Sequence, residues 1–115
     1  MFDSNYQLAN AIKRDQNAKA DKGKIRMELI PTTAFKGLGR VLTFGAEKYG
    51  DNTWQGVETE RYIGALLRHI CAYIEDPYGR DEESRLYHTE HILANAMFLN
   101  HEVMRNAPET PDPKV

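Results

Sequence analysis

Three of the four histidines lie within residues 68–100, beside a dense acidic turn. In the sequence DEESRLYHTEH, Asp81 and Glu83 come shortly before His88 and His91, which are three residues apart. On a helix this spacing turns both imidazoles to one side, as a site for a divalent metal requires. Carboxylate oxygens from the turn could complete the ligand shell, which favours Mg²⁺ or Mn²⁺ if oxygens dominate and Zn²⁺ if the histidines dominate.

The segment after the turn also carries polar residues inside its apolar face. At about 100° per residue, His88, His91, Asn95 and Glu102 fall between Phe98 and the other apolar side chains. The rest of the apolar sector comprises Ile92, Ala96, Leu99 and Val103, and the water-facing side is expected to carry Glu90, Ala94, His101 and Arg105. A buried polar row needs partners, because each unsatisfied group costs roughly 1–3 kcal/mol. A metal, a ligand and an internal hydrogen-bond network all remain open, and in the last case the acids would only complement the helix dipole.

Basic and aromatic side chains offer a second kind of chemistry, which is nucleotide binding. Arginine can grip a phosphate through two donors, and an aromatic ring can stack on a base. Arg68 is the most informative of the cations because it neighbours His69 near the inner face of its helix. Exposed lysines are usually only solvated, and aromatic rings in small domains more often belong to the core. The candidates for phosphate are Lys24, Arg26, Lys36, Lys48, Arg61 and Arg68, and those for a base are Tyr49 and Trp54.

Composition narrows the class of protein. A chain of 115 residues with 41% hydrophobic and 28% charged residues is typical of one globular domain. The net charge of −2 does not favour a nucleic acid polymer or an anionic membrane as partner. We find no signal-peptide pattern and no apolar run long enough to span a bilayer. The lone Cys71 excludes an internal disulfide and a cysteine-rich zinc site. We therefore expect a cytoplasmic protein.

The elements that must position these residues are helices. Apolar spacing, together with Pro31, Gly50 and Pro77 as punctuation, predicts three main helices. Thr59 is expected to cap the second helix, and the third is expected to open near Ser84. The predicted ranges are about residues 32–50, 59–76 and 84–106. The predicted fold class is all-α, a compact helical bundle.

The ends of the chain are predicted to be less regular. Residues 3–14 can form a short N-terminal helix, and the alternating basic residues of 22–31 indicate an extended arm that Met27, Leu29 and Ile30 could anchor on the core. Three prolines within the last nine residues indicate a disordered tail. The predicted division is residues 1–21 for the helix and connection, 22–106 for the helical nucleotide-binding domain and 107–115 for the tail. A homodimer or homotetramer is expected, because three short helices can scarcely enclose a nucleotide.

Several motifs occur together and in a fixed order. They are KGKIRMELIP, FGAEKYG, NTW, RYIGALLRH and the pattern D-E-E-S-x-x-x-H-x-x-H-x-x-x-N-x-x-F-L. The ordered set resembles the dATP/dGTP diphosphohydrolase family of phages and bacteria, small all-α proteins related to the MazG-like nucleotide pyrophosphatases. The resemblance covers roughly residues 22–102.

The resemblance implies hydrolysis of a purine deoxynucleoside triphosphate to the monophosphate and pyrophosphate, with Mg²⁺ or Mn²⁺. Within the matched motifs, we assign Arg68, His69 and Glu83 to catalysis and Asp81, Glu83, His88 and His91 to the metal. The residues assigned to the substrate are Lys24, Arg26, Lys48, Tyr49, Trp54, Arg61 and Asn95. Ser84 also matches the acidic-turn motif.

The chain departs from the pattern at two points. The family often has glycine after the turn serine, where this chain has Arg85. The wider MazG group uses EExxE followed by ExxD, and neither is present, so a metal shell must be built from Asp81, Glu83 and the histidines. An alternative function is a non-catalytic protein, encoded by a phage, that binds and sequesters a signalling nucleotide. A third is a structural helical domain.

Overall fold

The computed structural model describes residues 22–108. Its elements are the 3₁₀ turn η2 (Met27–Leu29), α2 (Thr32–Tyr49), the 3₁₀ turn η3 (Thr53–Gly56), α3 (Thr59–Glu75) and α4 (His88–Asn106). Within this part of the chain there is no strand, only an isolated bridge between Arg80 and Tyr87. The all-α prediction with three main helices is confirmed. The predicted N-terminal helix and most of the predicted tail fall outside the described residues. No helix among those described is long and apolar enough to cross a membrane.

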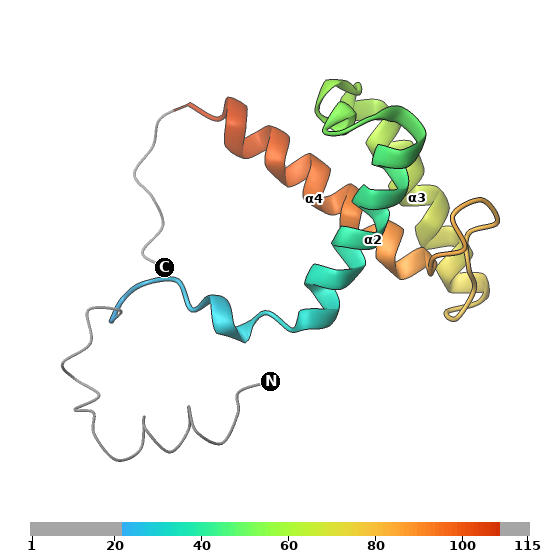
Figure 1. The fold of residues 1–115 in the computed structure, drawn as a ribbon, viewed down its shortest axis with the longest axis horizontal. Helices are drawn as coiled ribbons and strands as arrows, with labels where there is room; N and C mark the ends of the chain where they lie inside the picture. Colours follow the sequence, from blue (N-terminus) through green and yellow to red (C-terminus); the bar gives the residue numbers. More distant parts are fainter. Residues whose placement is uncertain (1–21, 109–115) are drawn as a thin grey trace, which may run out of the picture. The chain divides into compact units, whose positions relative to one another are not determined.

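The helix α4 contacts both of the other long helices (Figure 1). It packs most extensively against α3, and its N-terminal half also packs against α2. Among the described helices, α2 and α3 make their helix contacts with α4 rather than with each other. Cavities lined by residues of all three helices lie between α2 and α3, so these two helices form the walls of a cleft and α4 forms its floor.

The core explains one wrong prediction about α4. Val41, Tyr62, Ala94 and Phe98 are the buried apolar residues of the described part, and Ala94 is 0% exposed. The helical spacing of the sequence predicts Ala94 on the water-facing side and Val103 in the buried sector. Val103 is in fact 62% exposed. The reason is that α4 buries two faces, one against each neighbouring helix, whereas the prediction assumed a single buried face. The buried position predicted for Asn95 is confirmed.

The helix ends were predicted closely, except for the start of α4. Gly50 ends α2 with φ of 99°, a backbone conformation that favours glycine. Thr59 was expected to cap α3, but its hydroxyl instead donates a hydrogen bond of 2.8 Å to Glu102 on α4. α4 begins at His88 rather than near Ser84, because the residues before it close a tight loop.

The segment before α2 differs from the predicted extended arm. It contains the single 3₁₀ turn η2, and Gly23 has a positive φ of 83°. Leu29 and Ile30 are exposed, so the prediction that they anchor the arm on the core is wrong. Residues 22–27 belong to a compact unit separate from residues 28–108. The role of Lys24 and Arg26 at the site therefore stays a prediction.

Candidate functional site

The structure brings three possible metal ligands together from separate parts of the sequence. His69 on α3, Asp81 in the following loop and His88 at the start of α4 each offer an atom, and these atoms all lie within 4.8 Å of one another. The Nδ1 atoms of His69 and His88 are 2.9 Å apart and share a hydrogen bond. Two ligand atoms that each lie about 2.1 Å from the same ion are separated by a similar distance. Two imidazoles and a carboxylate are ligands that Zn²⁺ and Mn²⁺ accept. The donor set therefore fits a divalent metal.

His91 lies against this group and is held from two sides. Its ring stacks on that of His69, with 4.5 Å between centroids and 7° between planes. Its Nε2 is hydrogen bonded to the hydroxyl of Ser84 at 2.7 Å. The Asn95 side chain donates to the backbone carbonyl of His91 at 2.8 Å, one turn earlier. His91 is thus fixed beside the three-donor group, with its own ring nitrogen already engaged by Ser84.

The loop between α3 and α4 positions Asp81. The Asp81 carboxylate accepts hydrogen bonds from the backbone N–H groups of Glu83 and Ser84, at 3.0 and 2.8 Å. The Asp81 N–H donates to Leu86 and its carbonyl accepts from Arg85, so the loop closes on itself. A Cβ at Gly79 would lie 3.3 Å from the His88 ring and 3.1 Å from the carbonyl oxygen of Asp76. Glycine at this position therefore lets His88 approach the loop closely.

The electrostatics of the cluster keep its members in their ligating forms. Burial, followed by the neighbouring His91, lowers the pKa of His69 to about 4. Burial also lowers the pKa of His91, against the opposing effect of Asp81. For Asp81, burial would raise the pKa, but hydrogen bonds from Ser84 and Glu83 and the charge of His91 outweigh it and lower the pKa. At neutral pH His69 and His91 are thus neutral imidazoles and Asp81 is an ionised carboxylate, which are the forms that bind metals.

Arg85 stands at a position whose backbone favours glycine, the residue that the resemblance leads us to expect there. Its φ is 65°, in the left-handed region that is unfavourable for residues with a Cβ. We predict that Arg85→Gly stabilises the protein by about 0.5–1 kcal/mol, measured by urea unfolding. Glu82→Gly, at an exposed position of the same loop without a positive φ, is the control and should be neutral or destabilising. A loss of stability in Arg85→Gly would contradict the prediction.

The lowered pKa of His69 also predicts acid sensitivity. The folded protein binds fewer protons than the unfolded chain between pH 6.5 and about 4, so stability should fall as the pH drops through this window. Above pH 6.5 both states hold a neutral His69, and this contribution is constant. Because His69 is only partly buried, we expect a loss of about 1–2 kcal/mol. Urea unfolding in EDTA at several pH values measures it. His69→Gln should flatten the dependence more than the control His101→Gln, and equal slopes would contradict the prediction.

Two adjoining cavities occupy the cleft between α2 and α3. The larger has a volume of about 710 Å³ and the smaller about 520 Å³. The residues that line both are Val41, Val57, Arg61, Tyr62 and Phe98. The shared lining shows that the two cavities adjoin one another, and together they form a depression with walls from α2 and α3 and a floor from α4.

Most of the predicted substrate residues line this depression. Lys48, Tyr49 and Trp54 border the larger cavity. The smaller cavity is bordered by Arg68, His69, His91 and Asn95, and Arg61 belongs to both. Aromatic rings therefore gather at one end, and arginines and histidines at the other. Their roles in binding stay predictions.

Glu83 occupies a different place from Asp81. Its two carboxylate oxygens each accept a hydrogen bond of 2.7 Å from Lys48 Nζ, at the rim of the larger cavity. Glu83 has the largest effect on the pKa of Lys48 and Tyr49 the next largest, and both raise it. Glu83 is not one of the three donors that lie within reach of one another. Metal ligation by Glu83, as we predicted, would require it to leave Lys48.

The sequence did not single out several residues that shape the site. Tyr62, Val57 and Phe98 line both cavities, but residues of these types are ordinary core residues in a sequence. Gly64 was also missed. The Arg68 guanidinium lies 3.2 Å from where a Cβ of Gly64 would stand, so Arg68 folds back along α3 over this glycine. The four-residue spacing of the pair is the signal that could have revealed the contact.

Comparison with known proteins gives the chain its family. A family model described as dATP/dGTP diphosphohydrolase, N-terminal, matches residues 14–112. A dATP/dGTP diphosphohydrolase of Salmonella phage PMBT28 is 34% identical over 94 residues, which cover 82% of this chain and 32% of that protein. The chain thus spans about a third of the length of this relative. No solved structure matches. The resemblance read from the motifs is confirmed, and the chain belongs to the dATP/dGTP diphosphohydrolase N-terminal family.

Proposed function

We propose that this chain binds a purine deoxynucleoside triphosphate, dATP or dGTP, and hydrolyses it to the monophosphate and pyrophosphate with a divalent metal. The observation that carries the proposal is that an aromatic cavity adjoins a second cavity, which is lined by His69 and His91 of the histidine cluster. Family membership supports the same class of substrate. The two volumes are in the range of sites that hold small-molecule ligands.

The placement of the triphosphate follows from charge. Arg61 and Arg68 border the smaller cavity, where they would neutralise phosphate oxygens, Arg68 through its two-pronged guanidinium. The base would lie in the larger cavity beside Trp54 and Tyr49, where a ring can stack. The scissile bond would then lie toward the histidines. This orientation places the charged and the apolar parts of the ligand against matching walls.

His69, Asp81 and His88 would hold the metal, Mg²⁺, Mn²⁺ or Zn²⁺. Such an ion supplies charge stabilisation at the phosphoryl group and lowers the pKa of a bound water. The chain's own contribution is orientation. His69 is held by His88 and stacked on His91, and Ser84 fixes the His91 ring. His91 would then orient water beside the metal ligands.

One observation favours the alternative of binding without turnover. Asp81 is the only carboxylate in the described three-donor group, and Glu83 is engaged by Lys48. A site with a single carboxylate holds a hard cation such as Mg²⁺ less firmly than the acidic sites that Mg²⁺ usually occupies. Under this alternative the same depression would retain a nucleotide without cleaving it.

The test is a panel of nucleotides with Mg²⁺, Mn²⁺ or Zn²⁺, scored separately for pyrophosphate and for orthophosphate. The proposal requires pyrophosphate from dATP or dGTP and a loss of release in EDTA. Tight binding without any release would favour the sequestering function. Neither binding nor release would leave a structural helical domain, and orthophosphate as the sole product would refute the assigned bond cleavage.

We also propose that the chain self-associates as a homodimer or homotetramer through α3. Ile63, Leu67 and Ile74 fall on one side of this helix, and Leu67 and Ile74 are 55% and 71% exposed. A stripe of exposed aliphatic residues is typical of an association surface. Light scattering should show an oligomer that Leu67→Lys converts to monomer, while Glu75→Lys on the same helix should leave it unchanged. A wild-type monomer at micromolar concentration would contradict the proposal.

A further inference from the structure

Lys48 and Glu83 form an ion pair at the rim of the larger cavity. Lys48 Nζ, on the last turn of α2, donates to both carboxylate oxygens of Glu83 at 2.7 Å, and both residues line this cavity. Their side chains are 38% and 62% exposed, so a ligand in the cavity can reach both. Exposed ion pairs stabilise a fold by only about 0–1 kcal/mol. The pair can therefore exchange its internal hydrogen bonds for contacts with a ligand at little cost to the fold.

Aromatic rings border the Lys48 ammonium. Nζ lies 5.0 Å from the ring centroid of Tyr49 and 6.0 Å from that of Phe44, and both residues line the larger cavity. Trp54 lines it as well. Aromatic faces beside a charged pair suit a flat heteroaromatic ring that carries polar groups along one edge. A purine base is a ring of this kind.

The charges of the larger cavity suit a base better than a phosphate. The ion pair cancels its own charge, and the other charged residues that line this cavity are one of each sign, Asp51 and Arg61. The smaller cavity is lined by two arginines, Arg61 and Arg68, and by the single carboxylate of Glu60. The negative triphosphate is therefore drawn to the smaller cavity, which leaves the ion pair to meet the uncharged base.

The order of the two charges matches guanine. The edge of guanine carries the carbonyl oxygen O6, then N1–H and then the N2 amino group, which is one acceptor followed by two donors. An ammonium beside a carboxylate is the complementary order, since an ammonium only donates and a carboxylate only accepts. Adenine has an amino group in place of O6 and an unprotonated N1. The same ion pair would then set donor against donor and acceptor against acceptor.

We propose that the Lys48–Glu83 pair recognises the base of the nucleotide and makes the site prefer dGTP over dATP. Glu83 accepts hydrogen bonds from N1–H and N2–H of guanine, and Lys48 donates one to O6. The inference rests on the proposed nucleotide site and adds a base preference to it. It also gives the two residues roles other than those that the sequence suggested, which were metal binding and catalysis for Glu83 and phosphate binding for Lys48.

A competing explanation is that the pair serves the loop alone. The Glu83 N–H donates to the Asp81 carboxylate at 3.0 Å, so the contact with Lys48 also ties this part of the loop to α2. In that case the loss of the Glu83 charge would leave the base preference as it was. Asp51 provides a matched control, because it is the other carboxylate of the cavity and no ion pair is found for it within residues 22–108.

The experiment compares Glu83→Gln with Asp51→Asn. Calorimetry with Mn²⁺ measures binding of three probes, which are analogues of dGTP and dATP whose α,β-bridges resist hydrolysis, and inorganic tripolyphosphate, which has no base. The wild type should bind the dGTP analogue about tenfold or more tightly than the dATP analogue. Glutamine presents one acceptor and one donor, as adenine requires, so Glu83→Gln should lower this preference by about tenfold or more and leave tripolyphosphate binding within about twofold. Asp51→Asn should keep the preference.

Lys48→Met tests the other half of the pair. It should weaken binding of the dGTP analogue by about three- to tenfold, because O6 loses its donor, and leave tripolyphosphate binding within about twofold. An equal loss of tripolyphosphate binding would return Lys48 to the phosphates and overturn the proposal. The melting temperatures of all three variants in EDTA should stay near that of the wild type, because the substituted residues are exposed.

The remaining outcomes also overturn the inference. A wild type without a preference for guanine, or a preference that survives Glu83→Gln, removes the base contact. Weaker Mn²⁺ binding by Glu83→Gln without nucleotide, with the preference intact, makes Glu83 a metal ligand instead. Failure of the proposed function has a different appearance. A wild-type protein that prefers the dGTP analogue but releases no pyrophosphate from dGTP loses the hydrolase proposal while the base preference stands, and one that binds neither analogue loses both.

Discussion

Asp81→Asn should weaken Mn²⁺ binding and pyrophosphate release together, each on the order of 100-fold or more. Asp81 is the carboxylate of the three-donor group, so its replacement leaves two neutral imidazoles and no negative charge for the ion. The amide oxygen of asparagine can still accept the N–H groups of Glu83 and Ser84, so the loop should keep its shape. Metal titration by calorimetry, and release measured at saturating dGTP, give the two values.

The control for this variant is Glu82→Gln, which removes the same charge from the neighbouring exposed position. It should leave both values within about twofold of the wild type, because surface charges separated by water interact weakly. Thermal unfolding in EDTA must show Asp81→Asn to be folded. A folded Asp81→Asn that binds Mn²⁺ as the wild type does would remove Asp81 from the metal site.

A substitution of Glu83, in the same loop, distinguishes a metal ligand from a residue that only holds the rim of the cavity. We first assigned it both a metal and a catalytic role, yet its carboxylate is paired with Lys48 at the rim of the aromatic cavity. If Glu83 ligates the metal, it must first leave Lys48, and Glu83→Gln should then weaken Mn²⁺ binding as Asp81→Asn does. If it only holds the rim, Mn²⁺ binding should be preserved and nucleotide binding should change instead.

The extents of the helices could be predicted because local chemistry dictates them. Gly50 ends α2 and Pro77 prevents α3 from continuing, and both effects depend on a single residue's backbone. The start of α4 could not be predicted as well. Asp81 and Ser84 satisfy their hydrogen bonds inside a closed loop, which competes with the helical turn that their residue types also permit.

The residues of the candidate site could be named from the sequence, but the geometry that brings three of them together could not. Ordered motifs brought His69, Asp81 and His88 to attention, but His69 and His88 are 19 positions apart, and only the packing of α3 on α4 places their Nδ1 atoms 2.9 Å from each other. Ala94 shows the same limit. A helical wheel assigns a residue to one face, whereas α4 has neighbours on two faces, and sequence alone did not show the second neighbour.

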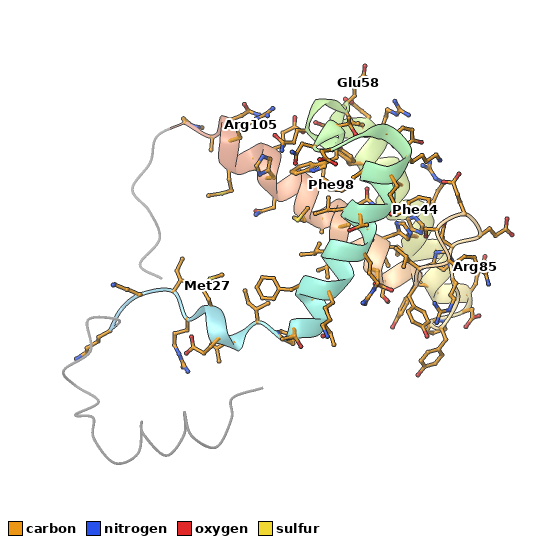
Figure 2. The ribbon with its side chains drawn as sticks, viewed as in Figure 1. Met27, Phe44, Glu58, Arg85, Phe98 and Arg105 are labelled. Carbon is orange, nitrogen blue, oxygen red and sulfur yellow. The ribbon has the colours of Figure 1, made fainter. Side chains whose placement is uncertain are left out.

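Phe98→Ala should produce the largest loss of stability, about 3–5 kcal/mol. Phe98 lies on α4 (Figure 2) and lines both cavities, and its ring contacts those of Trp54 and Tyr62. Removing it leaves a cavity between three elements and ends both ring contacts. Small domains are stable by only about 5–15 kcal/mol, so much of the folded population should be lost. Urea unfolding measures the change, and Phe35→Ala, at an exposed position on α2, should cost much less. Equal losses in the two variants would contradict the described core.

Phe98→Leu separates the ring's role in the fold from its role in the site. Leucine fills much of the space and should cost roughly 1–2 kcal/mol, so the protein stays folded. The aromatic face that Phe98 offers to Trp54 is lost nevertheless, and with it the support that orients Trp54 in the larger cavity. The two probes are a dGTP analogue whose α,β-bridge resists hydrolysis and inorganic tripolyphosphate, which has no nucleoside. We expect binding of the analogue to weaken while tripolyphosphate binding persists, because the arginines and histidines of the smaller cavity are untouched. Unchanged binding of both probes would mean that Trp54 does not depend on Phe98 for its position, and equal weakening of both would mean that the two ends of the depression are not independent.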